Sequence, residues 1–482
     1  MPTYEASYPP NLYHPARPRS EQYQLWPFKG PLSVSVSKWI NAVTAMVVVW
    51  LHVLYWGERT VYSSAIDACD WSRWENWPEG ASPERVVLVA DPQLVDPHTY
   101  PGRNFVFLGL TEYYVDKYMH RTWGYLESML DSDATIFLGD LFDGGREWDH
   151  DVWVDEFKRF QKIFPVKEGK LTLFETAGNH DIGLGDTIVV DALQRFTAYF
   201  GEPNRQIVIG NHSIVILDTD SMMNTNNEEI YGPPRAFFDD IVRKSHTDPF
   251  PLVLLTHIPL YRPPDSPCGP KREGNPSIPI AKGYQYQNVL NSDLSDEILH
   301  KLHPVAVFSG DDHDACRHVH EYAQGRHTTV EYTVKTFSIA MGVSYPAFEM
   351  ISLWNPRDGT TDRPTLQARL CMLPSQFDIF KFYFKILIVT FVVEYAAAYK
   401  AWRARKKYGT PGLDVLGSEK KWGGSVYTNY YTVMSRKIWS NKWAIRIWGR
   451  PATFKNEFMV RMSKVASVVC VIYMWLLFRN VV

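Results

Sequence analysis

The stretch that decides the fold runs from residue 134 to residue 145 and reads ATIFLGDLFDGG. Its first five residues are apolar or β-branched, which predicts a buried strand, and Gly139-Asp140 follows at once. Asp143 comes three residues later, so the strand ends in a turn that carries two carboxylates. Because ligand sites in α/β sheets form just beyond the carboxyl ends of strands, this block predicts a site at the edge of a sheet.

Four other apolar runs end in polar residues that can bind a metal ion. These residues are Asp91 and Gln93 after 85–90, Asn179, His180 and Asp181 after 171–176, His257 after 252–255, and Asp311, Asp312 and His313 after 305–308. We expect the five strand ends to converge on one pocket. Oxygen and imidazole ligands arranged around a shared carboxylate are what a two-metal hydrolase requires.

The rest of this region predicts a layered α/β fold. Further strands are expected at 206–209, 214–217 and 331–339, and helical spacing of apolar residues is found at 115–130 and 152–164. Strands that alternate with helices and are then followed by more strands favour an α/β/β/α sandwich. Residues 263–282 are rich in Pro and Gly and predict a long loop that can cover the site.

In their order, the five blocks resemble the calcineurin-like metallophosphoesterases, over roughly residues 85–320. The resemblance implies that Asp140 bridges two divalent metal ions, that Asp91, Gln93 and His313 complete the first ion's ligands, and that Asn179, His257 and Asp311 complete the second ion's ligands. It also implies that His180 faces the phosphate. We expect His180, next to Asp181, to act as the general acid.

Two positions depart from the family's usual pattern. Gln93 stands where a His is usual, and Asp311 stands where the first His of Gly-His-x-His is usual, with Asp312 beside it as an alternative ligand. Amide and carboxylate oxygens are hard ligands, so we expect metal binding to persist, with manganese the preferred ion. Asp143 is expected to orient the ligands, and Arg146 either contacts phosphate or forms a surface salt bridge.

A closer resemblance narrows the substrate. ADPQL (90–94), CGPKRE (268–273), GYQYQN (283–288) and EYTVKTFS (331–338) are similar to the fungal phosphoesterases that remodel glycosylphosphatidylinositol (GPI) anchors. That resemblance implies removal of an ethanolamine-phosphate branch from a GPI mannose, with GPI-anchored proteins or the GPI lipid as partners. Which mannose is trimmed stays open. The alternatives are hydrolysis of another lumenal phosphodiester or lipid headgroup, and a non-catalytic scaffold that retains its metal.

Three apolar stretches predict transmembrane helices at 39–56, 379–399 and 459–478. Basic residues precede the first stretch and follow the second, which indicates that both of these flanks are cytosolic. The expected order is therefore a cytosolic tail (1–38), a lumenal catalytic domain (57–378) and a basic cytosolic loop (400–458). The resemblance to the GPI-remodelling enzymes implies the membrane of the endoplasmic reticulum, with the early Golgi as an alternative. A cleaved signal peptide is the alternative for the first stretch.

Charge and cysteine content agree with this arrangement. The net charge is −3, and no basic stripe runs through the catalytic region, so we expect no nucleic-acid partner. Cys69, Cys268, Cys316 and Cys371 all fall in the expected lumenal region, where disulfides form; three pairings, or free thiols, stay open. Asn211 begins a glycosylation sequon.

Overall fold

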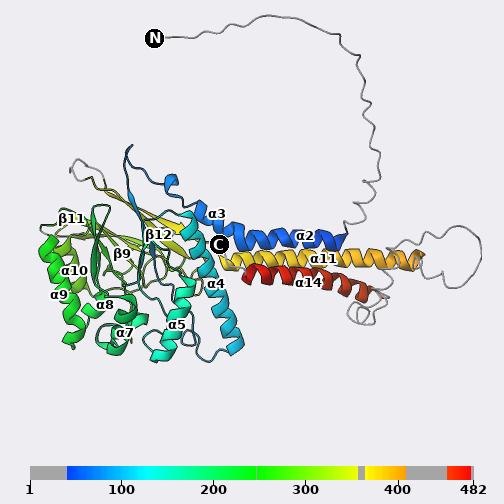
Figure 1. Cartoon of the computed structure of the whole chain (residues 1–482), viewed down its shortest axis with the longest axis horizontal. Helices are drawn as coiled ribbons and strands as arrows, with labels where there is room; N and C mark the ends of the chain where they lie inside the picture. The colour runs from blue at the N-terminus through cyan, green and yellow to red at the C-terminus, as the bar shows by residue number, and fades with distance from the viewer. Residues whose placement is uncertain (1–40, 246, 357–363, 409–452, 479–482) are drawn as a thin grey trace, which may run out of the picture.

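The computed structural model describes residues 41–245, 247–356, 364–408 and 453–478 of the chain. Figure 1 shows an α/β domain from which a bundle of three long helices projects. The domain contains two mixed sheets, and a continuous apolar core lies between them, built from residues of both sheets such as Val86, Ile136, Val253 and Phe308. The expectation of a layered α/β/β/α sandwich is confirmed.

The first sheet carries the earliest part of the domain. Its strand order is β13 (Leu366–Met372), β12 (Ala347–Leu353), β1 (Glu84–Val89), β2 (Ala134–Phe137) and β3 (Leu171–Leu173). β1, β2 and β3 are parallel, so their carboxyl ends lie at one edge of the sheet. β12 and β13 extend the sheet in antiparallel fashion.

The second sheet carries the later blocks. Its strand order is β10 (Cys316–Tyr322), β11 (His327–Thr333), β9 (Ala306–Ser309), β6 (Leu252–Leu255), β5 (His212–Ile216) and β4 (Arg205–Ile209). β5, β6, β9 and β11 are parallel neighbours. A small ribbon of β7 (Lys282–Gly283) and β8 (Tyr286–Gln287) lies in the connection between β6 and β9.

Helices cover the outer face of each sheet. α4 (Phe105–Met129), α5 (His150–Ile163) and α7 (Val190–Phe200) contribute to the core of the first sheet, whereas α8 (Thr219–Met222), α9 (Glu228–Ser245) and α10 (Ser292–Leu302) contribute to that of the second. α5 shows why: Trp153 and Phe160, seven residues apart, face inward together, and both are almost fully buried. The short α6 (Asn179–Ile182) begins at the Gly-Asn-His-Asp block.

One expected strand differs from the observed one. Residues 331–339 were predicted as a single strand, but β11 ends at Thr333. Val334 still donates its N–H to Ser309 in the second sheet, whereas Phe337 donates to Ala90 in the first, so the chain crosses between the sheets here. The crossing brings Thr336 next to Ala90 and thus next to the end of β1.

The projecting bundle consists of α2 (Ala42–Tyr55), α11 (Gln376–Tyr408) and α14 (Phe454–Phe478), which pack together through an apolar cluster. α2 continues through a π-helical turn (Trp56–Thr60) into α3 (Val61–Asp67), which reaches the domain. Among the described residues, Phe454–Phe478 is the one helix that is long and apolar enough to cross a membrane. The tail 1–38 and most of the loop 400–458 lie outside the described residues, and the domain boundaries remain predictions.

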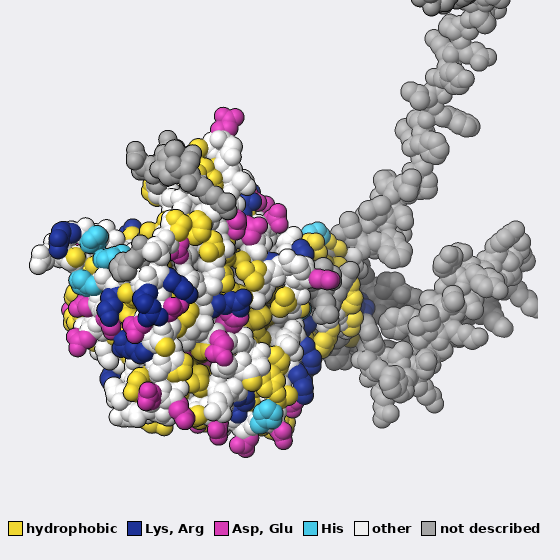
Figure 2. Space-filling model, turned by 60° about the vertical axis from the view of Figure 1, so that its left-hand side comes forward, with side chains coloured by type: hydrophobic (Ala, Val, Ile, Leu, Met, Phe, Trp, Pro, Cys, Tyr) yellow, Lys and Arg dark blue, Asp and Glu magenta, His cyan; other side chains and the backbone are white. Residues whose placement is uncertain are grey.

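Covalent links fasten the domain at two places. Cys69 is bonded to Cys371 and Cys268 to Cys316, which is one of the three pairings left open by the sequence. Asn211 lies in the tight turn between β4 and β5, where its side chain donates a hydrogen bond to the carbonyl of Asn355 at 2.6 Å. On the face shown in Figure 2, acidic and basic side chains are interspersed, in keeping with the balanced net charge.

Candidate metal centre

The carboxyl ends of the strands from both sheets meet at one edge of the sandwich and bring the predicted ligands together. Asp91, Asp140 and His313 form one group whose ligand atoms all lie within 4.8 Å of one another. Asp140, His257 and Asp311 form a second group by the same criterion. Asp140 belongs to both groups, which is the geometry that a carboxylate bridging two ions requires.

The backbone is bent sharply at most of the predicted ligands. The φ angles are 46° at Asp91, 39° at Gln93, 50° at Asp140, 64° at Asp311 and 64° at His313, all in the left-handed region. This conformation costs about 1–3 kcal/mol for a residue with a side chain, and such residues cluster at functional sites. The left-handed turn changes the direction of the chain at each of these residues and directs the side chain toward the site. Gly178 must also lack a side chain, since a Cβ there would collide with Asp140.

Hydrogen bonds orient three of the ligands. Nδ1 of His257 donates to the carbonyl of Leu138 at 2.8 Å, which leaves Nε2 to face the site. The amide nitrogen of Asn179 donates to the carbonyl of Gln285 at 2.9 Å, so its oxygen faces inward. The amide nitrogen of Gln93 likewise donates to Asp143 at 2.9 Å. Partners of this kind fix which atom a ligand offers to a metal ion.

Several oxygens at this site are buried without any partner in the described part of the chain. They are Oδ2 of Asp91, Oε1 of Gln93 and Oδ2 of Asp311. Buried polar atoms are nearly always hydrogen-bonded or bound to an ion, because an unpaired one costs free energy. All three belong to predicted ligands and are hard oxygen donors. The residues present therefore fit a pair of divalent cations.

The electrostatics of the site also favour bound cations. Burial raises the pKa of Asp91 well above its ordinary value, and burial together with the nearby Asp140 charge raises that of Asp311 to about 7. Burial lowers the pKa of His313 to about 4, so this imidazole is neutral and has a lone pair for a metal. Carboxylates crowded together away from water repel one another until positive charge is added.

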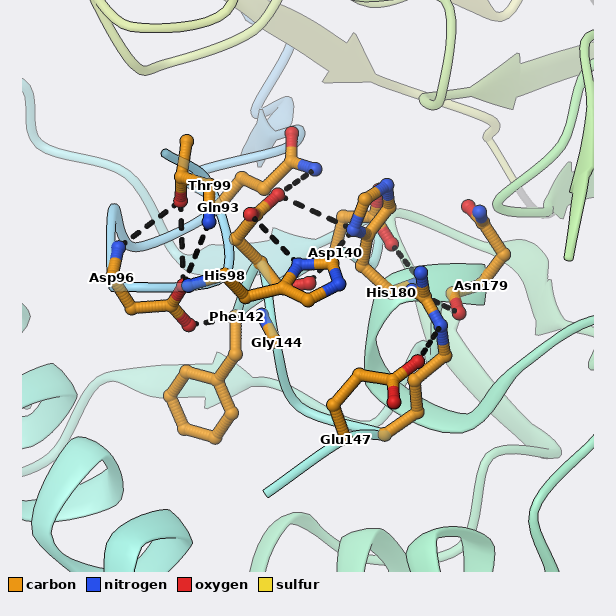
Figure 3. A network of polar contacts seen from close by, with 12 residues as sticks. Gln93, Asp96, His98, Thr99, Asp140, Phe142, Gly144, Glu147, Asn179 and His180 are labelled. Atoms are coloured by element: carbon orange, nitrogen blue, oxygen red, sulfur yellow. Dashed lines mark hydrogen bonds and ion pairs between the residues drawn. The ribbon is translucent and has the colours of Figure 1, made fainter. Parts of the chain in front are cut away.

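A second network adjoins the ligands and contains His180 (Figure 3). Nδ1 of His180 donates to the backbone carbonyl of Asp143 at 2.8 Å and lies 3.3 Å from its carboxylate. Since Nδ1 carries the proton, Nε2 faces away from Asp143. The backbone N–H of His180 donates to Asp140 at 2.9 Å, which ties the imidazole to the shared ligand. The expectation that Asp143 orients the ligands agrees with its hydrogen bond to Gln93.

The structure also places three further predicted residues. Asp181 does not support the His180 ring; its carboxylate accepts backbone N–H groups, including those of Leu141 and Gly178. Arg146 lies 3.4 Å from the carboxylate of Glu147, which agrees with the salt-bridge alternative, and it also donates to Gln285 at 2.7 Å and to the Asn179 carbonyl at 3.0 Å. Asp312 pairs with Arg272 and belongs to neither of the two ligand groups.

Sequence reasoning missed two other sets of residues. Asp220 is 1% exposed, and within the described residues neither of its carboxylate oxygens has a partner; burial raises its pKa well above the ordinary value. The sequence does contain a pattern that points to Asp220, because Asp218-Thr219-Asp220 follows β5 just as the predicted ligands follow their strands. Asp96 and His98, which lie beside Asp143, stand in a loop without a recognisable motif.

The comparisons with known proteins agree with this geometry. The family model described as calcineurin-like phosphoesterase matches residues 85–315. Cell division control protein 1 of Saccharomyces cerevisiae is 44% identical over 351 residues, which make up 71% of this chain and 71% of that protein. Metallophosphoesterase 1 homolog of Caenorhabditis elegans is 25% identical over 347 residues, 70% of this chain and 87% of that protein. Metallophosphoesterase 1 of Mus musculus is 26% identical over 307 residues, 57% of this chain and 72% of that protein. The chain thus belongs to the calcineurin-like phosphoesterases and is a metal-dependent hydrolase of phosphoric esters.

Proposed function

We propose that this protein is a phosphodiesterase that removes an ethanolamine-phosphate branch from a mannose of GPI anchors in the endoplasmic reticulum. The observation that carries the proposal of a two-metal hydrolase is the position of Asp140 in both ligand groups. The substrate follows from the resemblance of residues 90–94, 268–273, 283–288 and 331–338 to GPI-remodelling phosphoesterases.

In this proposal the ligands divide between two ions that share Asp140. Asp91, Gln93 and His313 hold the first ion, and Asn179, His257 and Asp311 hold the second. Bound divalent cations supply positive charge that activates water and stabilises the negative charge that develops on phosphate oxygens. Manganese suits this mostly oxygen-based set.

His180 is the proposed contact to the phosphate. Its Nδ1 is occupied by the Asp143 carbonyl, so Nε2 is free to donate a hydrogen bond or a proton. A quarter of its side chain is exposed, whereas His257 is almost fully buried. His180 is therefore more accessible to a phosphate that approaches from solvent than His257 is.

The loop at 263–282 is proposed to shape the opening to the site. It is fastened rather than free: Cys268 is bonded to Cys316, Arg272 pairs with Asp312, and Glu273 pairs with Lys335. Two of these anchors, Asp312 and Cys316, lie beside the ligands Asp311 and His313 in the chain. A fixed rim of this kind favours selection of substrates by shape.

A membrane-tethered substrate fits the position of a large apolar cavity. The cavity measures about 790 Å³ and lies between the loop at Tyr100 and Arg103, the helix α4 and the first turns of α11. Phe107, Phe377 and Phe380 contribute apolar walls. The loop at Tyr100 follows the ligands Asp91 and Gln93 in the chain, and Phe377 and Phe380 belong to α11 of the helix bundle. The bundle is proposed to anchor the enzyme in the membrane, with residues 57–378 in the lumen.

Mass spectrometry of GPI glycans tests this function. Cells whose only copy carries Asp140→Ala should accumulate GPI-anchored proteins with one additional ethanolamine phosphate and should export them slowly. Cells that carry Glu321→Gln, at an exposed glutamate of β10, provide the matched control and should have wild-type glycans. Glycans of unchanged mass in the Asp140→Ala cells would refute the GPI substrate and leave the hydrolase assignment untouched.

A further inference from the structure

His98 is a second imidazole at the site that no strand-end motif accounts for. Its Nδ1 lies 3.3 Å from one carboxylate oxygen of Asp143, and the other oxygen lies 3.3 Å from Nδ1 of His180. A single carboxylate thus stands between two histidines. Figure 3 shows His98 entering this network from the side of Asp96 and Thr99, and His180 entering from the side of Asn179.

The loop that carries His98 is held rigidly by Asp96, which is 1% exposed. One oxygen of Asp96 accepts the backbone N–H groups of His98, at 2.8 Å, and of Thr99, at 3.1 Å. The other oxygen accepts the N–H of Gly144 at 3.0 Å and the indole N–H of Trp148 at 2.9 Å. Both oxygens are therefore satisfied, so the trio of Asp96, His98 and Asp143 is a hydrogen-bonded brace and not a further metal site.

The brace leaves one nitrogen of His98 available to a substrate. Nδ1 is turned toward Asp143, and Nε2 has no hydrogen-bond partner among the described residues. A third of the side chain is exposed, compared with a quarter for His180. A carboxylate beside an imidazole fixes the orientation of the ring and thus the direction of its outer nitrogen.

Hydrolysis of a phosphodiester needs proton or hydrogen-bond donors at two places. A non-bridging oxygen gains negative charge as water attacks, and the leaving oxygen gains the electron pair of the breaking P–O bond. His180 has a single free imidazole nitrogen, Nε2, so it can serve only one of these two oxygens. A leaving alcohol of a sugar is a weak acid, so its departure without a proton is slow.

We propose that His98 is a catalytic residue that protonates the leaving alcohol, while His180 contacts the phosphoryl oxygens. This assignment rests on the proposed phosphodiesterase function. The oxygen of water bonds to phosphorus, and the P–O bond to the alcohol breaks with its electron pair on the alcohol oxygen. That oxygen takes the proton from Nε2 of His98. The attacking water releases one proton to solvent, and His98 regains one from solvent through its exposed edge, so the cycle is balanced.

A series of aryl methyl phosphates tests the proposal, because phenol acidity can be varied without changing the phosphate. His98→Gln should lower kcat about 100-fold for the unsubstituted phenol but less than about 3-fold for p-nitrophenol, which leaves without help. His180→Gln should lower kcat by a similar factor across the whole series. His150→Gln, an exposed histidine at the start of α5, should change neither. An equal loss across the series in His98→Gln, or no loss at all, overturns the assignment.

Two further measurements separate catalysis from structural support. His98→Gly should regain turnover of the unsubstituted phenyl ester when free imidazole is added, which the loss of a structural brace would not allow. Bound metal should be unchanged in both His98 variants; loss of metal contradicts the proposal. Asp140→Ala should be inactive on every ester in the series. If Asp140→Ala retains activity, the two-metal function fails, independently of the result for His98.

Discussion

Nε2 of His257 lies 3.3 Å from Oδ1 of Asp140, and both side chains are 1% exposed. Burial opposes ionisation of both groups, yet their mutual attraction dominates: it raises the pKa of His257 well above its ordinary value and lowers the pKa of Asp140. This attraction holds the His257 ring against the Asp140 carboxylate within the buried site. One member comes from the end of β2 and the other from the end of β6, so the contact joins the two sheets.

Asp140→Ala is expected to abolish metal binding at both positions and all turnover. One carboxylate belongs to both ligand groups, so its loss removes a ligand from each ion and leaves His257 without its partner. Elemental analysis of the purified variant should find less than one metal ion per chain. Two tightly bound ions in this variant would contradict the bridging role.

His180→Ala is expected to keep both metal ions but to lose on the order of 10²–10⁴-fold in kcat, the range typical for loss of an acid–base or hydrogen-bonding group. The ring contacts Asp143 and is not a member of either ligand group. Metal content and steady-state kinetics on one preparation check both halves of the prediction. Loss of the metals, or near-normal turnover of an ester with a poor leaving group, would be the wrong result.

Manganese is expected to support activity better than zinc. The proposed ligands offer oxygen from Asp91, Gln93, Asp140, Asn179 and Asp311 and nitrogen from His257 and His313 alone. Oxygen-rich sites suit harder ions. The measurement is reactivation of chelator-stripped protein with each metal in turn. Full restoration by zinc, together with stoichiometric zinc in the protein as isolated, would contradict the expectation.

Glu349 is expected to make stability depend on pH. Burial in β12 raises its pKa to about 8 from an ordinary value of 4.5. Its protonated form is favoured in the folded state, so this contribution to stability is complete below about pH 4.5 and is lost as the pH rises to about 8. The free energy of unfolding changes by at most about 1.4 kcal/mol per pH unit for one such group. Thermal unfolding of Glu349→Gln should depend less on pH between 5 and 8, roughly the window set by the two values.

The control for that measurement is Glu321→Gln, on an exposed position of β10, which should follow the wild-type profile. A wild-type slope in Glu349→Gln would mean that other groups cause the pH dependence.

The orientation in the membrane is open to protease digestion of sealed microsomes. Residues 400–458 are predicted to be cytosolic and residues 57–378 lumenal, so added protease should cut in the first range and spare the second. Detergent should expose both ranges. The reverse pattern of cleavage in intact vesicles would invert the topology and remove the GPI anchor from reach of the site.

The five strand-end blocks could be recognised in the sequence because metal chemistry admits few residue types and α/β sheets place them at strand ends. Residues 85–90, 134–138 and 252–255 coincide closely with β1, β2 and β6 for the same reason, since each is an uninterrupted apolar run. Side chains that act through local contacts leave no such pattern. His98 is a single histidine in a loop, and its position depends on hydrogen bonds from Gly144 and Trp148 to Asp96.

Other features could not be predicted from the sequence, because they depend on contacts between segments that are far apart in the chain. Asp181 was expected to support the neighbouring His180 ring, but its carboxylate is drawn to the unpaired N–H groups of the turn after β2, including Leu141 at 3.1 Å. The cysteine pairing depends on which strands become sheet edges, since Cys371 lies on β13 and Cys316 on β10. β12 and β13 themselves were not anticipated, because they follow the last ligand block and carry no part of it.

The disulfide between Cys69 and Cys371 has a consequence for reach. It ties the end of α3, which continues from α2, to β13, which leads directly into α11. The disulfide thereby links the two segments that connect α2 and α11 to the catalytic domain. We expect this link to limit the rotation of the domain relative to the helix bundle. If the bundle anchors the protein in a membrane, as proposed, we expect the metal centre to stand at a fixed distance from the bilayer and to act on phosphates presented at that distance.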